Sequence, residues 1–412
     1  MASRPNFVLI VSDQQRYDSL GCNGNCFVET PCLDRLAAEG ARCTAGFTPW
    51  PVCSPSRATM WTGVYPHAHG ITKNVPRVDD ALHSVAQVST TVFDLLKAAG
   101  YLTAYFGKWG LGHQNPGMFD VWDAFNSRGG HWVQVGTDRR YKPDVQTDHC
   151  LEFLRGAARG RQPFVMVQGY YPPHDPYTAP EPFYAPYRGR GVPFPGYYAA
   201  VSAIDFNTGR IVQAIDDLGL AENTVIMYFT DHGDTFFARA ESEHNAVCFD
   251  DAIRIPMIAR CPGRIRTGLT VDAVVGLQDV MPTVLEWGGV PIPAYAHGRS
   301  VRPWFEGHAP AWRDAYYVET VTDRSDYVQR CVRTDEWKLI LSRGGPHALY
   351  HLTADPEEQL DLYQTRGDAQ GGQPGHVPGY AAEVRELARR LRALACELDD
   401  PTGIELADSV LA

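Results

Sequence analysis

The sequence lacks the features that mark membrane proteins and nucleic-acid-binding proteins. No uninterrupted apolar run is long enough to span a bilayer. The polar start Met1-Ala2-Ser3-Arg4-Pro5 passes directly into the apolar run Asn6–Val11, which is too short and too polar at its ends for a secretory signal. Lysine and arginine total 37 against 48 aspartates and glutamates, a formal net charge of -11, and no Lys/Arg run supplies a local basic field. We therefore expect a cytoplasmic protein with no nucleic-acid or membrane partner, in which an anionic ligand must be held by local charge.

The sequence also lacks a zinc-ribbon spacing and an internal repeat. Its ten cysteines are scattered, and the pair Cys22 and Cys26 has no matching partner pair or histidine cluster. We expect most of them to be buried, reduced thiols. A chain of 412 residues is long enough for one large core with a smaller domain appended.

Several continuous apolar runs end in polar residues. Such runs are typical of parallel strands that are buried on both faces, and in open α/β sheets ligands gather at the carboxyl ends of the strands. The runs are Phe7–Val11 before Asp13, Tyr101–Phe106 before Lys108, Pro163–Gly169 before His174, and Asn223–Thr230 before Asp231 and His232. Each polar residue also has a structural interpretation, as a cap, a solvated lysine or a satisfied loop histidine.

The stretch from Cys53 to Gly63, Cys-Ser-Pro-Ser-Arg-Ala-Thr-Met-Trp-Thr-Gly, predicts a short helix with a cysteine at its start. Ser54 can act as the N-cap, Pro55 fits the first helical position, and Gly63 closes the helix. The N-terminus of a helix favours an anion or an anionic nucleophile. A buried cysteine in front of an ordinary helix fits the same residues equally well.

The residues Cys53-Ser54-Pro55-Ser56-Arg57, followed by Thr62-Gly63, resemble the signature of the formylglycine-dependent sulfatases of the alkaline phosphatase superfamily, which also includes choline sulfatases and phosphonate monoester hydrolases. The resemblance implies that a formylglycine-generating enzyme converts Cys53 to an aldehyde. The hydrate of that aldehyde would then attack a small anionic ester, a sulfate ester first of all.

The resemblance also implies one divalent cation. Its ligands would be Asp13, Gln14, the formylglycine oxygen at Cys53, Asp231 and His232, with Asp234 a weaker candidate beside them. Predominantly oxygen ligands favour calcium, then magnesium, and the single imidazole keeps manganese open.

Further roles come from the same resemblance. Arg57 and Lys108 would contact the sulfate oxygens, and His174 would assist the leaving group. Two positions depart from the family pattern: Gly110 stands where a histidine is usual, with His113 nearby, and the usual sulfate-binding lysine falls on Asn245.

For substrate binding we expect Lys108, His174, Asn245 and also His244, which is the group nearest to Asn245 that can carry charge. Three alternatives to a sulfatase remain. They are a phosphonate or phosphate ester hydrolase using the same formylglycine, a phosphomutase-like relative, which would need a serine or threonine nucleophile and a second metal cluster, and a catalytically silent protein.

The predicted fold is α/β, with a large mixed, mostly parallel sheet flanked by helices as in alkaline phosphatase. Residues 1–310 would form the catalytic domain, and residues 311–412 a C-terminal α+β subdomain with a small antiparallel sheet and a helix over Ala381–Leu398. Residues 114–142 show no clear period and are predicted to form a loop over the site, and residues 366–378 a surface loop.

Overall fold

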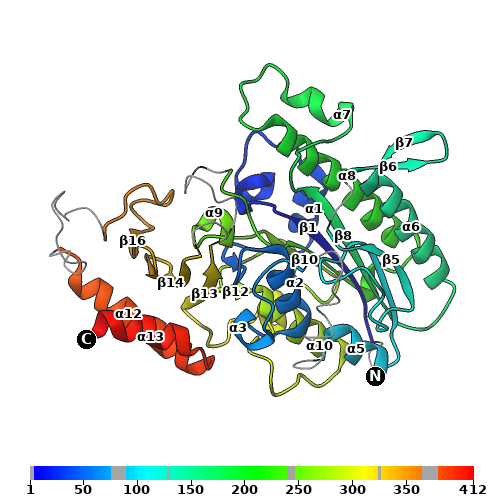
Figure 1. Cartoon of the computed structure of the whole chain (residues 1–412). Helices are drawn as coiled ribbons and strands as arrows, with labels where there is room; N and C mark the ends of the chain where they lie inside the picture. Colours follow the sequence, from blue (N-terminus) through cyan, green and yellow to red (C-terminus); the bar gives the residue numbers. More distant parts are fainter. Residues whose placement is uncertain are drawn as a thin grey trace.

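The computed structural model describes residues 4–75, 90–127, 130–236, 238, 246–322, 326–363 and 379–412. Its centre is an eight-stranded sheet with the strand order β11-β2-β10-β9-β1-β8-β4-β5 (Figure 1). In that order the strands are Leu269–Val271, Ala41–Cys43, Met257–Arg260, Thr224–Thr230, Asn6–Asp13, Phe164–Pro173, Leu102–Lys108 and Val121–Phe125. Only β10 runs antiparallel to its neighbours β9 and β2, so the sheet is mixed and mostly parallel, as predicted.

The central strand β1 explains the continuous apolar runs of the sequence. It pairs in parallel with β8 on one side and β9 on the other, and every one of its residues is buried. Alternate side chains enter two separate cores, Phe7, Leu9 and Val11 on one face and Val8 and Ile10 on the other. A strand covered on both faces has no position at which a polar residue is favoured until it ends.

Helices cover both faces of the large sheet. One face packs against α2 (Cys53–Thr62), α5 (Val92–Ala98) and α10 (Val280–Gly288). The other face packs against α1 (Pro31–Glu39), α6 (Lys142–Ala157) and α8 (Pro195–Asp217). The described residues of this part also form the short α-helices α3 (Pro66–His69), α7 (Glu181–Tyr184), α9 (Asp250–Ile253) and α11 (Arg302–Phe305).

The described residues also form two sheets of two strands each. β3 (Gly46–Phe47) pairs with β12 (Val275–Gly276), and β6 (Trp132–Val135) pairs with β7 (Asp138–Tyr141). The prediction of one loop over residues 114–142 is therefore wrong, because β5 extends the edge of the large sheet and β6 and β7 form a hairpin. These strands are short and their residues are largely half-buried or exposed, so the sequence shows no clear hydrophobic periodicity there.

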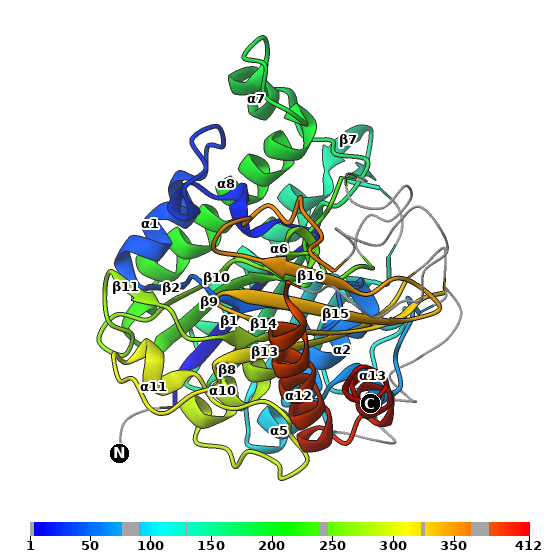
Figure 2. The same cartoon turned by 90° about the vertical axis from the view of Figure 1, so that its left-hand side faces the viewer.

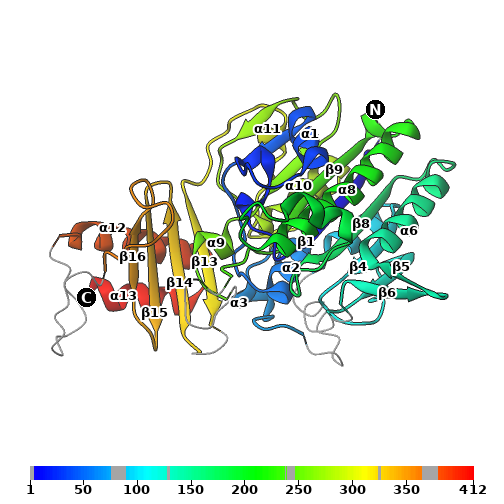
Figure 3. The same ribbon diagram turned by 90° about the horizontal axis from the view of Figure 1, so that it is seen from above.

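The C-terminal part is an antiparallel sheet with two helices. Its strands, in spatial order, are β13 (Ala315–Val321), β14 (Val328–Thr334), β15 (Trp337–Arg343) and β16 (Ala348–His351). The helices α12 (Ala381–Glu397) and α13 (Pro401–Leu411) pack on one face of this sheet (Figures 2 and 3). The other face packs on residues from earlier in the chain, including Phe47 and Ile253.

The predicted small sheet and its helix are confirmed, whereas α13 was not predicted. The boundary between residues 310 and 311 stays a prediction, and the predicted loop 366–378 lies outside the described residues. Within the described ranges, none of the helices is both long and apolar enough to cross a bilayer.

Candidate active site

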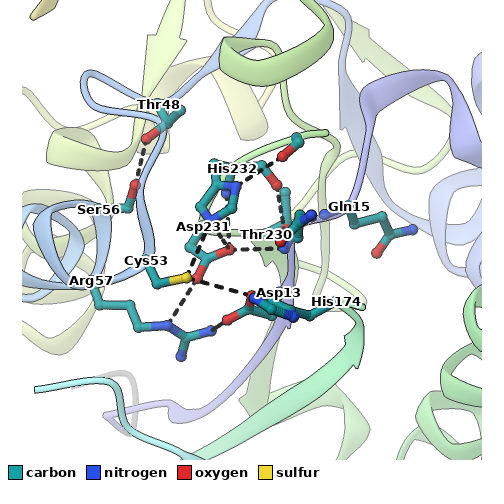
Figure 4. A network of polar contacts seen from close by, with 12 residues as sticks. Asp13, Gln15, Thr48, Cys53, Ser56, Arg57, His174, Thr230, Asp231 and His232 are labelled. Atoms are coloured by element: carbon teal, nitrogen blue, oxygen red, sulfur yellow. Dashed lines mark hydrogen bonds and ion pairs between the residues drawn. The ribbon is translucent and has the colours of Figure 1, made fainter. Parts of the chain in front are cut away.

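The polar residues that follow the strands meet at the carboxyl edge of the large sheet. Asp13 ends β1, Lys108 ends β4, and Asp231 and His232 follow β9 directly. The N-terminus of α2 brings Cys53 to the same point, so that its sulfur lies between Asp13 and His232 (Figure 4). The geometry thus follows from parallel strands whose ends are adjacent in the sheet.

Helix α2 begins at Cys53 itself, and its N-cap residue is Val52, so the prediction of Ser54 as the N-cap is wrong. The Ser54 hydroxyl instead donates to the carbonyl of Gly110 at 2.6 Å and accepts from the backbone N–H of Val75 at 3.0 Å. The helix ends at Gly63, which adopts the left-handed conformation expected of a C-cap glycine (φ 70°).

Cys53 is a buried thiol in a strongly charged environment. Its Sγ lies 3.3 Å from Nε2 of His232 and 3.6 Å from Oδ1 of Asp13. Burial and Asp13 raise the thiol pKa, whereas Lys108 and His232 lower it, and the result is a pKa of about 7. The electrostatics therefore favour an anionic group at position 53.

Arg57, one turn into α2, binds both site carboxylates. Its Nε donates to Oδ2 of Asp231 at 2.9 Å and its Nη2 to Oδ2 of Asp13 at 3.0 Å, with all three side chains fully buried. Its Nη1 donates to the carbonyl of Lys108 at 2.8 Å. The Lys108 ammonium also contacts Oδ2 of Asp13. Although burial alone would raise the pKa of Asp13, Lys108, His174 and Arg57 hold it well below its usual range.

His174 lies on the far side of Asp13 from α2 and is held by its own loop (Figure 4). Its Nδ1 lies 2.9 Å from the carbonyl of Asp175 and 3.0 Å from that residue's Oδ1, so this nitrogen carries a proton. Burial lowers the pKa of His174, but hydrogen bonds with Asp175 and Cys53 raise it well above its ordinary value. A protonated imidazole beside Cys53 can donate to a leaving oxygen.

Tyr171 is a neighbour of this site that the sequence did not reveal. Its ring stacks on His174 with centroids 4.7 Å apart and planes 27° apart. The Lys108 ammonium lies 4.8 Å from the centre of the same ring. The only signal in the sequence was its position three residues before His174, and that position does not show whether the tyrosine side chain contacts the site.

The donors expected for a cation lie together. Ligand atoms of Asp13, Cys53, Asp231 and His232 are all within 4.8 Å of one another, and all four residues are buried. The His232 Nδ1 lies 2.8 Å from the carbonyl of Gly233, so Nδ1 carries a proton and donates it to this oxygen. The other ring nitrogen, Nε2, is then the one that faces the cluster. Two carboxylates and one imidazole fit a hard divalent cation, so the residues present match the group that the resemblance implies.

Gln14 lies against the same cluster. Its backbone N–H donates to Oδ1 of Asp231 at 3.1 Å, and its side-chain amide donates to Oδ2 of Asp234 at 2.7 Å. The structure thus brings together Cys53, Arg57, Lys108, His174 and the proposed metal residues. The two remaining substrate-binding residues, His244 and Asn245, lie outside the described residues, so their placement stays a prediction.

Gly110 has no room for the histidine that the resemblance places there. A Cβ atom at this position would lie 2.6 Å from Cδ of Arg57, and the backbone is left-handed, with φ 78°. His113 is exposed to solvent. In this chain the side chain of Arg57 occupies the space beside residue 110.

Two family models match the chain. The model described as Sulfatase matches residues 5–290, and that of the N-sulphoglucosamine sulphohydrolase C-terminal region matches residues 244–371. An ulvan-active sulfatase of Formosa agariphila is 29% identical over 401 residues, covering 87% of this chain and 77% of the relative.

Solved structures share the fold over nearly the whole chain. A protein from Bacteroides fragilis described as a sulfatase has a TM-score of 0.82 at 24% identity, covering 98% of each chain. The phosphonate monoester hydrolase of Agrobacterium radiobacter has a TM-score of 0.77 at 22% identity, covering 96% of each chain. These likenesses establish the predicted fold, with its large α/β sheet and small C-terminal sheet.

Proposed function

The chain belongs to the sulfatase family and is a sulfuric ester hydrolase, and on this premise we propose that it attacks sulfur with the hydrate of a formylglycine made from Cys53. The observation that carries the proposal is the convergence of Cys53, at the N-terminus of α2, with Asp13, Asp231 and His232 within 4.8 Å. A cysteine and three residues that could hold a cation thus share one buried site, which supports the proposal.

The reaction that we propose has two steps. One hydroxyl of the hydrate gives up its proton to solvent and attacks the sulfur, and the bond from sulfur to the leaving-group oxygen breaks, which releases the alcohol and leaves the sulfate on residue 53. The second hydroxyl then loses its proton, the carbon–oxygen bond to the sulfate breaks, and the aldehyde re-forms. Addition of one water to the aldehyde restores the hydrate, so each cycle consumes one water. An unmodified thiol or a serine has no second hydroxyl and cannot release the sulfate in this way.

The residues around position 53 have separate roles. Lys108 and Arg57 stabilise the charge on the sulfate oxygens, and His174 donates its proton to the leaving oxygen. Asp13, Gln14, Asp231 and His232 would hold a divalent cation, calcium first, which would supply a positive charge that lowers the pKa of the hydrate and neutralises the ester. His244 and Asn245 would complete the contacts to the substrate.

All ten cysteines are free thiols, which fits a reducing compartment such as the cytoplasm. Conversion of Cys53 requires a formylglycine-generating enzyme as a partner during maturation, and the substrate is a small anionic ester. We also propose that residues 1–310 act as the catalytic domain and residues 311–412 as its C-terminal subdomain.

The test compares an aryl sulfate with an aryl phosphonate monoester, using the full chain produced together with a formylglycine-generating enzyme. We expect a higher kcat/KM for the sulfate, and no turnover by Cys53→Ala or Cys53→Ser. Cys396→Ala is the matched control, because Cys396 is an exposed free thiol on α12. A higher kcat/KM for the phosphonate would replace the proposal with the phosphonate hydrolase. Absence of turnover with the aldehyde present would indicate a catalytically silent protein.

A further inference from the structure

Asp234 is a fully buried carboxylate on which three groups from different loops converge. Its Oδ2 accepts the side-chain amide of Gln14 at 2.7 Å and the phenolic hydroxyl of Tyr177 at 2.5 Å. Its Oδ1 accepts the backbone N–H of Phe236 at 2.8 Å. The carboxylate therefore joins the end of β1, the loop after β8 and the loop after β9.

The three residues bound to Asp234 share an unusual backbone conformation. Gln14, Tyr177 and Phe236 have φ angles of 61°, 47° and 51°, and they are three of the seven non-glycine residues with positive φ among those described. Each such residue costs about 1–2 kcal/mol relative to an ordinary conformation. Strain of this kind persists where the surrounding contacts fix it, and it gathers at functional sites.

The backbone of Asp234 is fixed as firmly as its side chain. Its N–H donates to the carbonyl of Asp251 at 2.9 Å, and its carbonyl accepts Nη1 of Arg16 at 2.9 Å. Arg16 in turn forms an ion pair with Asp251 at 2.8 Å. The carboxylate therefore has one orientation, which the groups that bind to it must match.

We propose that Asp234 is a positioning residue that turns the side-chain amide oxygen of Gln14 toward the cation site, an inference that rests on the proposed function of that site. An ionised carboxylate only accepts hydrogen bonds, so the NH₂ of Gln14 must face it, and the planar amide then directs Oε1 the other way. The backbone N–H of Gln14 is bonded to Asp231, which places this residue beside the ligand cluster.

The same contact explains why residue 14 is an amide. A carboxylate at this position would face the carboxylate of Asp234 in a buried environment, where two like charges repel strongly. Glutamine supplies an oxygen to the cation and an N–H to Asp234 at once. A glutamine at this position adds no negative charge to those of Asp13, Asp231 and Asp234.

The test is a double-mutant cycle read out as cation affinity, measured by calorimetric titration of the full chain with calcium chloride. Loss of a partner that orients a metal ligand typically weakens binding about 10–100-fold, and we expect a loss of that order for Asp234→Asn and for Gln14→Ala. In the Gln14→Ala background, Asp234→Asn should weaken binding no further. An undiminished effect in that background would show that Asp234 acts through its charge, which would overturn the proposal.

A second variant, Tyr177→Phe, tests the inference in case the Asp234→Asn protein does not fold. Tyr177→Phe removes the phenolic donor to Oδ2 without adding a polar group. We expect calcium affinity to fall a few-fold, again only when Gln14 is present. Unchanged affinity in Tyr177→Phe, with Asp234→Asn unfolded, would count against the proposal.

The control for burial is Asp205→Asn. Asp205 is also a buried carboxylate, but it accepts the backbone N–H groups of Leu33 and Cys32, away from the site. We expect this variant to lose stability while keeping its calcium affinity. The wild-type titration separates a failure of this inference from a failure of the proposed function. A wild-type protein that bound none of calcium, magnesium and manganese would refute the cation site itself.

Discussion

Replacing Gly110 with alanine is expected to destabilise the protein by about 2–5 kcal/mol, because the change adds a backbone strain and a steric clash. The strain follows from the left-handed backbone (φ 78°), which costs an alanine about 1–2 kcal/mol. The clash follows from the added Cβ, which would lie 2.6 Å from Cδ of Arg57. Overpacking of a buried site costs about 1–3 kcal/mol more. Arg57 cannot move aside easily, because its guanidinium is bound to Asp13 and Asp231.

Gly70 is the matched control for this experiment. It has almost the same backbone conformation (φ 77°), but an added Cβ would have no neighbour within 4 Å. Gly70→Ala should therefore lose about 1–2 kcal/mol from strain alone. The free energy of unfolding from urea denaturation, together with kcat/KM for an aryl sulfate, gives both readouts. Equal destabilisation of the two variants, with full activity in Gly110→Ala, would refute the reasoning about Arg57.

Three further predictions concern the site and its surroundings. Tyr171→Leu should lower kcat/KM about 2–10-fold, because a stacked pair is worth about 0.5–1.5 kcal/mol, while Tyr171→Phe keeps the stack on His174 and should stay near wild type. His67 bonds to Glu319 through Nδ1 and to the carbonyl of Leu398 through Nε2. Burial lowers the pKa of His67, but its hydrogen bond to Glu319 raises that pKa above 6.5. Protonated His67 therefore stabilises the fold fully below pH 6.5, and this contribution is lost as the pH rises through the raised pKa. Because His67→Gln lacks this contribution at every pH, its Tm should fall less between pH 6 and pH 9 than that of the wild type. Chelation of the cation should abolish sulfatase activity and lower Tm, and added calcium should restore both. The Tm falls because a ligand present at 100 times its Kd contributes about 2.7 kcal/mol to the free energy of unfolding. A chelated enzyme with full activity would contradict the cation site.

The sequence was informative wherever one local signal determined the structure. The apolar runs that end in Asp13, Lys108 and Asp231 predicted strands whose ends meet, because parallel strands align their carboxyl ends at one edge. The short strand segments separated by turns after residue 311 likewise predicted the small antiparallel sheet. In each case the pattern within a few residues contains the information that the fold uses.

Other features depend on residues that are distant in the sequence, and no local pattern reveals them. Arg57 pairs with Asp231 across 174 positions, and that pairing exists only because α2 and β9 are brought together by the sheet. Ser54 was expected to cap its own helix, but its hydroxyl found a partner in Gly110 of another loop. The convergence of Gln14 and Tyr177 on Asp234 is likewise a product of three separate loops.

The central claim is that residue 53 carries an aldehyde in the working protein. The most direct test is the mass of the tryptic peptide that spans residues 43–57, which trypsin releases after Arg42 and Arg57, prepared from the native source. We expect the mass of a peptide with formylglycine at position 53. An intact thiol at Cys53 in every copy of an active preparation would contradict it.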